Sequence, residues 1–298
     1  MTTFGQLLFA GVSLGAIYAL VALGFTVVYR SSRVINFAQG ALLALGAFVT
    51  SWLVLSENLP FWAAFLVGAV TTALVGLFFQ LWVVRFAIGR PEFTIVMLTL
   101  GLAAVIGAVL PTFFGNYPRS NGDVWGSTAL HAGHFEFFWV QIWTIIAAVV
   151  VLLAYGAFTR FTRYGLAMRS AAMDPEAAIA VGIPLRRVYA TAWFIAGAVA
   201  CIGGVFLGGY PSSVNPTMSN IALLAFPAII LGGLDSPTGA IVGGFAIGII
   251  QELVQGYQPQ NAPWLGNDFY LIAPYLVMIL VLLVRPYGLF GSRPAERL

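Results

Sequence analysis

Charged residues are scarce in this chain. They make up 8% of its 298 residues, and hydrophobic residues make up 60%. Soluble globular proteins average about 25% charged residues. So few charges cannot cover the surface of a water-soluble domain of this length. The composition therefore excludes a soluble globular protein and predicts an integral membrane protein.

Lysine is absent, and all 13 basic residues are arginines. The phosphate-binding loop ends in Gly-Lys-Ser/Thr and a Schiff base needs a lysine amine, so both kinds of site are excluded. If transport here uses ATP, another subunit must hydrolyse it. The single cysteine, Cys201, allows no internal disulfide. No basic run interleaved with aromatic residues is present, so we expect no nucleic-acid partner.

The residues that could support metal or hydrolase chemistry form no recognised pattern. The only histidines are His131 and His134, and with Asp123 and Glu136 they do not match a zinc-ligand spacing. The segment Gly11–Gly15 reads Gly-x-Ser-x-Gly. That motif works on a strand-to-helix turn, whereas here it lies inside an apolar helical stretch. We predict no metal site, no catalytic residue and no enzyme activity in this chain.

Long apolar runs predict several membrane crossings, each needing about 20 mostly apolar residues. A stretch over Asn220–Ile250 is interrupted at Asp235, which leaves two short apolar pieces, and a last apolar piece covers Phe269–Val284. The fold class predicted is all-α, a polytopic transmembrane helix bundle. Six uncharged stretches meet the length requirement plainly: Leu7–Tyr29, Val34–Leu55, Pro60–Val84, Phe93–Phe114, Phe137–Phe158 and Val188–Gly209.

The arginines predict the orientation of the bundle, because cytoplasmic loops are enriched in positive charge. Arg119 is the only arginine in the loops of one side. An N-terminus outside and a C-terminus in the cytoplasm require an odd number of crossings, so Asn220–Ile250 must contribute zero or two. Two short crossings and a re-entrant pair both satisfy this condition, and we favour two crossings, which gives about nine in all (eight to ten). The arginines that alternate onto the other side are Arg30, Arg33, Arg85, Arg90, Arg160, Arg163, Arg169, Arg186, Arg187, Arg285, Arg293 and Arg297.

Glycines four residues apart form small-residue grooves along several predicted helices. Such a groove lets another helix approach closely, either within one bundle or at a subunit interface. The sequence favours packing within the bundle but leaves both interpretations open. The pairs are Gly11/Gly15, Gly204/Gly208, Gly239/Gly243 and Gly244/Gly248.

The predicted cytoplasmic loop 160–187 contains a short helix with clear end signals. Asp174 is a good N-cap, Pro175 suits the first turn, and Glu176 complements the positive helix end. Gly182 can end the helix. A helix this short is unstable unless it docks against something. We therefore favour a docking surface for a soluble partner over a mere connector.

This loop, from Tyr164 to Ile183, resembles the coupling loop of branched-chain amino acid ABC transporter permeases. The resemblance runs through the whole chain in the same order of motifs. Gln39 stands where many relatives have His, and Asp235 where a small or neutral residue is common, and these departures bear on the solute more than on the fold. The other matching segments are Gly15–Gly24, Arg33–Gly40, Ile230–Ala240 and Arg285–Gly291.

The resemblance implies that residues 1–298 form one transmembrane permease domain of a bacterial ABC importer in the inner membrane. Its implied partners are a second permease subunit (related or identical), two ATPase subunits that hold ATP and Mg, and an external solute-binding protein. No cofactor is expected in this chain. The residues expected to shape the coupling surface are Gly165, Arg169, Asp174, Pro175, Glu176, Ala177 and Gly182.

The polar residues of the predicted spans indicate what kind of solute crosses. No span carries an arginine at its middle, where it would be costly. A pathway with little fixed charge suits a zwitterionic or neutral solute with an apolar body, such as a branched-chain amino acid. Alternatives are another solute of the same family (urea, an amide, an aromatic or short organic acid) or, less favoured, a passive channel or secondary carrier. The candidate pathway residues are Ser13, Asn36, Gln39, Thr99 and Asp235.

Overall fold

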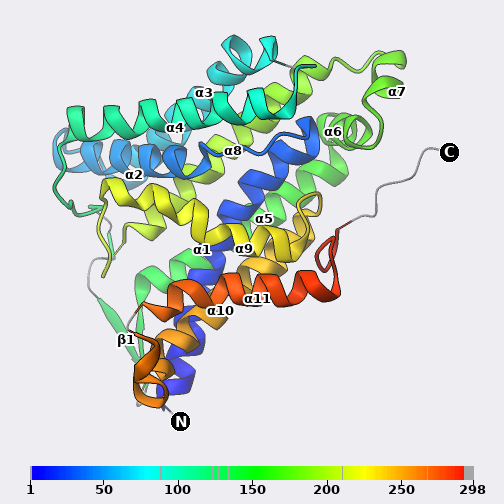
Figure 1. The fold of residues 1–298 in the computed structure, drawn as a ribbon. Coiled ribbons are helices and arrows are strands. Elements are labelled where there is room, and N and C mark those ends of the chain that lie inside the picture. Colours follow the sequence, from blue (N-terminus) through cyan, green and yellow to red (C-terminus); the bar gives the residue numbers. More distant parts are fainter. Residues whose placement is uncertain are drawn as a thin grey trace.

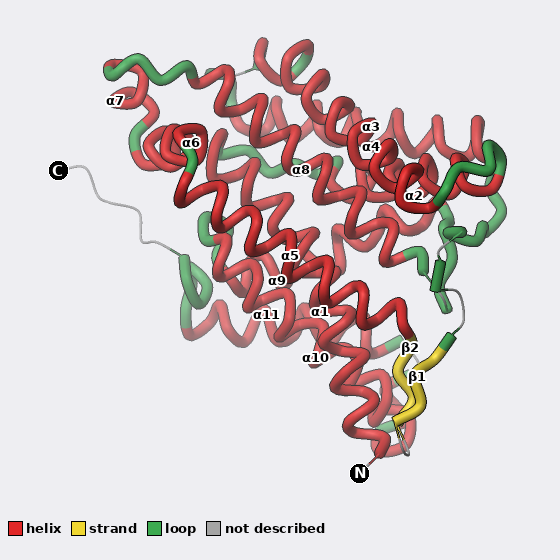
Figure 2. Tube along the Cα trace, turned by 180° about the vertical axis from the view of Figure 1, so that it is seen from behind, coloured by secondary structure: helices red, strands yellow, loops and turns green. Residues whose placement is uncertain are grey.

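The computed structural model describes residues 2–87, 89–122, 124–125, 128–132, 135–209, 211–266 and 268–291. Within these ranges the chain is a bundle of helices with one small β-hairpin (Figures 1 and 2). The main helices are α1 (Thr2–Ser32), α2 (Gln39–Leu55), α3 (Phe61–Trp82), α4 (Glu92–Phe114), α5 (Trp139–Phe161), α6 (Arg163–Met173), α7 (Pro175–Ala180), α8 (Leu185–Leu207), α9 (Ile221–Gly232), α10 (Pro237–Asn261) and α11 (Phe269–Val284). Short 3-10 turns are η1 (Val84–Phe86), η2 (Pro216–Asn220) and η3 (Pro263–Leu265).

The predicted all-helical membrane architecture is confirmed in its main features. Six of the described helices are long and apolar enough to cross a membrane, and three shorter apolar ones accompany them. The six predicted stretches coincide with α1, α2, α3, α4, α5 and α8, and the last piece with α11. The molecule is therefore a multi-pass helical bundle by length and composition.

The stretch predicted as two short pieces, Asn220–Ile250, differs from that prediction in its second half. The break around Asp235 is present, between α9 and α10. However, α10 is a full-length helix of 25 residues that continues past Ile250 to Asn261. The prediction stopped there because the next residues are polar. The structure accommodates Gln251 inside the bundle, where the Tyr18 hydroxyl donates to its Oε1 at 2.6 Å.

Helices α1 and α10 cross in very close contact through their glycines. A Cβ added to Gly15 would lie 2.7 Å from the Cα of Phe245, and one added to Gly248 would lie 2.3 Å from the Cα of Gly15. Real Cβ atoms do not approach backbone atoms so closely, so a larger residue would force the helices apart. The grooves of Gly11/Gly15 and Gly244/Gly248 therefore serve packing within this chain.

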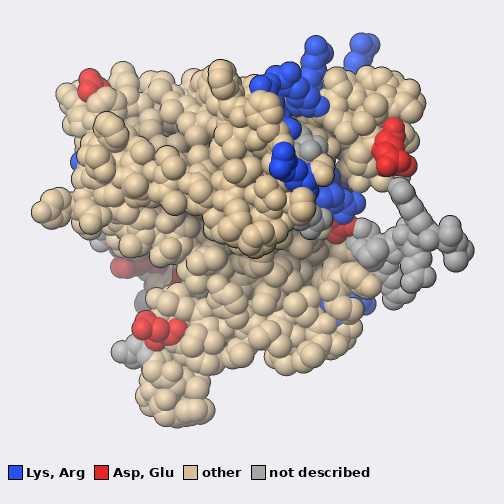
Figure 3. All heavy atoms as spheres, turned by 45° about the horizontal axis from the view of Figure 1, so that its top comes forward, with Lys and Arg blue, Asp and Glu red and all other residues tan. Residues whose placement is uncertain are grey.

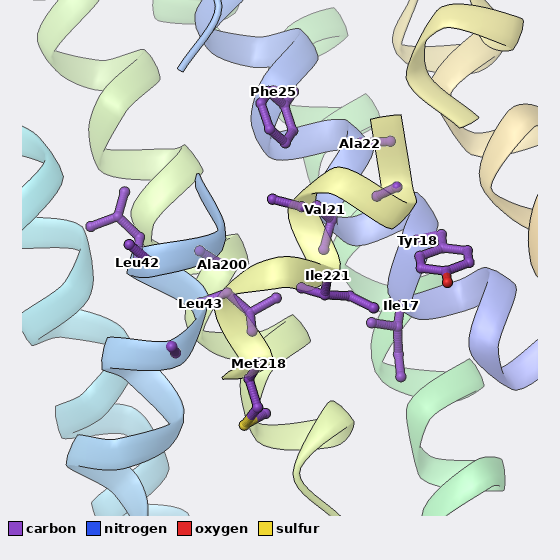
Figure 4. Packing of buried hydrophobic residues seen from close by; sticks show 14 of the residues in the cluster. Ile17, Tyr18, Val21, Ala22, Phe25, Leu42, Leu43, Ala200, Met218 and Ile221 are labelled. Carbon is purple, nitrogen blue, oxygen red and sulfur yellow. The ribbon is translucent and has the colours of Figure 1, made fainter. Parts of the chain in front are cut away.

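The largest buried apolar cluster lies where α1 and α2 meet α9 and η2. In the close view of Figure 4, Val21 and Phe25 of α1 lie among side chains from α2, α8, η2 and α9, including Leu43, Met218 and Ile221. Because lipid tails are as apolar as these side chains, close van der Waals packing holds the cluster together. This cluster anchors the short helix α9 against the long helix α1.

The outer faces of α3, α4 and α5 are strongly apolar. Large exposed side chains include Leu66 and Phe78 on α3, Val105 and Phe113 on α4, and Leu153 on α5. Continuous apolar faces of this kind fit lipid rather than water. Arg119 lies at one end of the bundle, and the other described arginines lie at the opposite end, which we call the arginine-rich end. Figure 3 shows most of the blue arginine atoms gathered at the arginine-rich end.

The segment between α4 and α5 contains a hairpin that the sequence did not predict. Strands β1 (Ala129–Ala132) and β2 (Phe135–Phe138) pair antiparallel, with His131 opposite Glu136. The other two residues weighed as metal ligands, Asp123 and His134, lie outside the described residues, as do Arg293 and Arg297. Among the described residues, no group of three His, Cys, Asp or Glu side chains could hold a metal ion.

Candidate coupling surface and inner cavity

Helices α6 and α7 form a bent unit at the arginine-rich end, capped by side chains as the sequence predicts. The Oδ1 atom of Asp174 accepts hydrogen bonds from the amides of Glu176 and Ala177, each at 3.0 Å. Pro175 is the first residue of α7. Gly182 ends the turn with φ of 84°, a left-handed conformation that glycine adopts at little cost. The predicted N-cap and helix end are both confirmed.

The corner between α5 and α6 depends on a close backbone approach at Gly165. Its amide donates to Oγ1 of Thr162 at 2.9 Å, which caps α6. A Cβ at Gly165 would lie 2.3 Å from the carbonyl oxygen of Phe158. Gly165 therefore fixes the angle at which the α6–α7 unit leaves α5.

The outer side of the α6–α7 unit presents apolar side chains next to acidic ones. Met173 is 85% exposed and Val181 is 76% exposed, and Ile179 is also exposed. Glu176 is exposed at the start of α7. Exposed apolar side chains at the polar end of a membrane protein, such as this exposed ridge of Met173, Ile179 and Val181, are typical of a surface that another protein covers.

Unlike the side chains of the exposed ridge, the side chain of Arg169 in α6 is partly buried against the bundle. Its side chain is half-buried, and its Nε atom is buried with no hydrogen-bond partner among the described residues. It borders a small pocket together with Arg30, Tyr155 and Thr159. Arg169 thus lies between the α6–α7 unit and the bundle, rather than on the exposed ridge.

A cavity of about 1170 Å³, the inner cavity, opens beside this unit. It lies among the arginine-rich ends of α1, α5, α6, α9 and α11 and the start of α10. Its charged lining residues are Arg30, Arg33 and Asp235, and hydroxyl groups come from residues such as Thr159 and Thr238. The apolar part of the lining includes Leu152, Ile230, Leu234, Ile241 and Leu282.

Arg33 is held at the edge of this cavity in an unusual backbone conformation. Its φ is 57°, in the left-handed region that residues other than glycine rarely adopt. Its Nη2 atom donates at 3.4 Å to the carbonyl oxygen of Ala172, the penultimate residue of α6. Its guanidinium lies 5.9 Å from the ring centre of Tyr29. Arg33 therefore links the end of α1 to the α6–α7 unit.

Three candidate pathway residues meet in one buried hydrogen-bonded cluster, away from the inner cavity. The Nδ2 atom of Asn36 donates to Oε1 of Gln39 at 3.2 Å, and Nε2 of Gln39 donates to the carbonyl oxygen of Ala196 at 3.1 Å. The amide of Phe37 donates to Oγ1 of Thr99 at 3.2 Å. Asn36, Gln39 and Thr99 are fully buried. The cluster joins the α1–α2 connection to α4 and α8.

The two remaining candidates lie elsewhere. Ser13 is buried in α1 between Gly11 and Gly15, the glycines that pack against α10. Asp235 is the only one of the five candidates among the residues that line the inner cavity. The other charged lining residues, Arg30 and Arg33, were interpreted from sequence as orientation signals alone. Their common cavity depends on helices far apart in the chain, so no local motif could reveal it.

The segment after α11 lines the inner cavity and is hydrogen-bonded to the end of α9. The amide of Leu289 donates to the carbonyl oxygen of Leu231 at 2.8 Å, and the amide of Phe290 donates to that of Gly232 at 3.1 Å. Gly288 has φ of 77°, which allows the chain to turn back against α9. These bonds satisfy carbonyl groups at the end of α9 that have no partner within the helix.

Comparison with known proteins agrees with this architecture. A family model described as "Branched-chain amino acid transport system / permease component" matches residues 7–282. The high-affinity branched-chain amino acid transport system permease protein LivH of Escherichia coli K12 is 32% identical, over 99% of this chain and 97% of LivH. BraD of Pseudomonas aeruginosa is 26% identical, over 98% and 97%.

Two more distant matches place the chain among related folds. The permease protein LivM of Escherichia coli K12 is 24% identical, over 96% of this chain and 71% of LivM. A chain of the solved structure of PsaBC from Streptococcus pneumoniae in complex with Fab superimposes with a TM-score of 0.53 at 11% identity, over 96% and 93% of the two chains, which shows similarity of fold. On the family match and the LivH identity together, the chain belongs to the permease component family of branched-chain amino acid transport systems.

Proposed function

We propose that this protein is a permease subunit of a bacterial ABC importer that carries branched-chain amino acids across the inner membrane. The observation that carries the proposal is the family match over residues 7–282, together with relatives similar over nearly their whole length. ATP and Mg would be bound by partner ATPase subunits, since this chain has no lysine for a phosphate-binding loop. The permease itself would carry out no chemistry.

The proposed topology has nine crossings, with the N-terminus outside and the C-terminus in the cytoplasm. The positions of the arginines support it. α9 has 12 residues and spans only about 18 Å. Its crossing would be completed by the chain that precedes it, because Val214 pairs through its backbone with Arg119 on the far side and η2 then continues into α9. α10, at about 37 Å, would return to the outside.

The α6–α7 unit, within loop 160–187, is the proposed docking surface for the ATPases. Its exposed ridge of Met173, Ile179 and Val181 would enter an apolar groove, and Glu176 would face basic groups on the partner. The remaining partners in the proposal are a second permease subunit, related to this one or a second copy, and an external solute-binding protein. The existence of LivH and LivM as distinct relatives supports the pairing of two different permeases.

The inner cavity is the proposed cytoplasmic mouth of the solute pathway. Its lining combines charged, hydroxyl-bearing and apolar side chains, and it lies directly beside the α6–α7 unit that would meet the ATPases. Ser13, Asn36, Gln39 and Thr99 would then stabilise the helices that border the pathway. Asp235 would face the solute as it leaves.

Reconstitution tests the proposal. The chain should be expressed with a second permease subunit, the ATPase subunits and the solute-binding protein of the same transporter, purified as a complex, and placed in liposomes. We expect co-purification of the ATPase and uptake of leucine that requires ATP and the binding protein. Uptake of urea, an amide or an organic acid instead of leucine would support an ABC importer but contradict the proposed solute. Uptake without ATP would contradict the importer itself.

A further inference from the structure

We infer that the inner cavity contains a weak binding site for a zwitterionic amino acid on the cytoplasmic side, where Arg30 and Arg33 hold the carboxylate. The inference rests on the proposed function and adds to it a location, a set of contacts and a consequence. The consequence is that amino acid accumulated inside slows its own import.

The first argument is the charge of the cavity wall. Arg30, in the last turn of α1, and Arg33, the residue that follows the helix, both line the cavity. Within the described residues neither side chain makes an ion pair, and the only side-chain hydrogen bond of Arg33 is the 3.4 Å contact with the carbonyl oxygen of Ala172. A guanidinium has several donors in a fixed fork that matches a carboxylate. Two such groups facing a hydrated cavity form a site for a carboxylate.

The second argument is that the same cavity offers the complementary features of a branched-chain amino acid. Asp235 supplies a carboxylate to the cavity lining, at the break between α9 and α10. It already has an interaction of its own within the protein, and a carboxylate can accept several donors at once. Leu234 and Ile241 provide an apolar surface beside it. Carboxylate, ammonium and apolar side chain therefore each find a matching surface.

The third argument is size. At about 1170 Å³ the cavity exceeds the roughly 300–1,000 Å³ typical of pockets that enclose a drug-sized ligand. A small amino acid would remain partly hydrated there. Its affinity would then be low, which suits a site from which solute must leave.

The site is also attached to the proposed coupling unit. Ala172 and Met173 of α6 line the cavity, and Arg33 contacts Ala172 directly. A shift of α6 would therefore move the carboxylate-binding wall. An occupied site would oppose that shift, so internal amino acid should slow both import and ATP hydrolysis.

Two measurements on the full complex test the site. Saturation-transfer NMR on the detergent-solubilised permease–ATPase complex, without binding protein, would probe leucine, 3-methylbutylamine (no carboxylate) and 4-methylpentanoate (no ammonium). Uptake of labelled leucine into liposomes would be measured with each probe inside. The variants are Arg30→Gln, Arg30→Lys and, as a matched control, Arg90→Gln, which removes a charge at the same end of the bundle but away from the cavity.

We expect leucine to bind and to inhibit from inside, and both analogues to do so much more weakly. Arg30→Gln should raise the internal leucine concentration for half-inhibition by about 10-fold, the effect of losing one charge-assisted contact. Arg30→Lys should restore part of it, and Arg90→Gln should match the wild type.

Several results would overturn the inference. No binding of leucine would do so, as would equal binding of 4-methylpentanoate, which would indicate a general anion site. Unchanged inhibition by internal leucine in Arg30→Gln would show that Arg30 does not bind the solute and serves only the orientation of the chain in the membrane. Co-purified phospholipid that displaces leucine would assign the cavity to a lipid headgroup. If the complex imports no leucine at all, the proposed function fails, while the NMR measurement still decides the site.

Discussion

The end of α7 at Gly182 allows a graded test of coupling. Gly182 has φ of 84°, and a Cβ placed there would meet nothing within 4 Å. A substitution would therefore cost only the left-handed backbone conformation, with no steric clash to complicate it. For an ordinary residue that cost is about 1–2 kcal/mol, which shifts a conformational equilibrium by about 5- to 30-fold.

The cost depends on the residue introduced, so a series of variants is more informative than one. Asn tolerates the left-handed region, Ala tolerates it less, and β-branched Val least. We expect solute-stimulated ATPase activity of the reconstituted complex to fall in the order Gly, Asn, Ala, Val, with normal membrane insertion throughout. Gly101→Ala is the matched control, because Gly101 also has open space around its Cβ but lies within α4 without a positive φ.

The reasoning would be refuted in two ways. Equal stimulation in all four proteins would show that the α6–α7 unit is only a connector. Loss of stimulation as large in Gly182→Asn as in Gly182→Val would show that backbone conformation is not what matters at this position.

Three further predictions concern topology and packing. In a Cys201→Ser background, a cysteine replacing Ser120 should react with an impermeant thiol reagent in intact cells. A cysteine replacing Arg90, which is exposed at the arginine-rich end outside the α6–α7 unit, should react only after permeabilisation; labelling of Arg90→Cys from outside would reverse the orientation. Gly15→Ala should destabilise the protein by about 1–3 kcal/mol and lower its Tm, since the added Cβ would lie 2.7 Å from a backbone atom of α10; an unchanged Tm would mean that α1 and α10 can separate freely. Gln39→Leu should also lower the Tm, because it leaves buried hydrogen-bond partners unsatisfied at about 1–3 kcal/mol, yet it should not change which amino acids compete for uptake; a changed competition profile would place Gln39 in the pathway.

Local signals in the sequence were sufficient for most of the helices. Apolar length located the spans, and the polar break at Asp235 located the division between α9 and α10. Asp174 and Gly182 marked the ends of α7 because capping depends on the residues within one turn. These features need no knowledge of distant neighbours.

The rest depends on contacts between distant segments. α10 passes beyond Ile250 because α1 supplies Tyr18 to bind Gln251. A glutamine in a span can bind a solute or another helix, and the sequence does not distinguish the two roles. The structure shows that Gln39 binds the carbonyl oxygen of Ala196 in α8. The inner cavity is formed by the ends of six helices, so neither the segment of Arg30 nor that of Asp235 shows by itself that both residues line it.

Competition for uptake tests the central claim most directly. The complete complex, in liposomes with ATP inside and binding protein outside, should import labelled leucine, and unlabelled isoleucine and valine should compete with it. Arginine and glutamate should fail to compete, because the described lining offers opposite charges suited to a zwitterion and an apolar wall. Strong transport of arginine or glutamate, or no ATP-dependent uptake of leucine-like amino acids, would contradict the account.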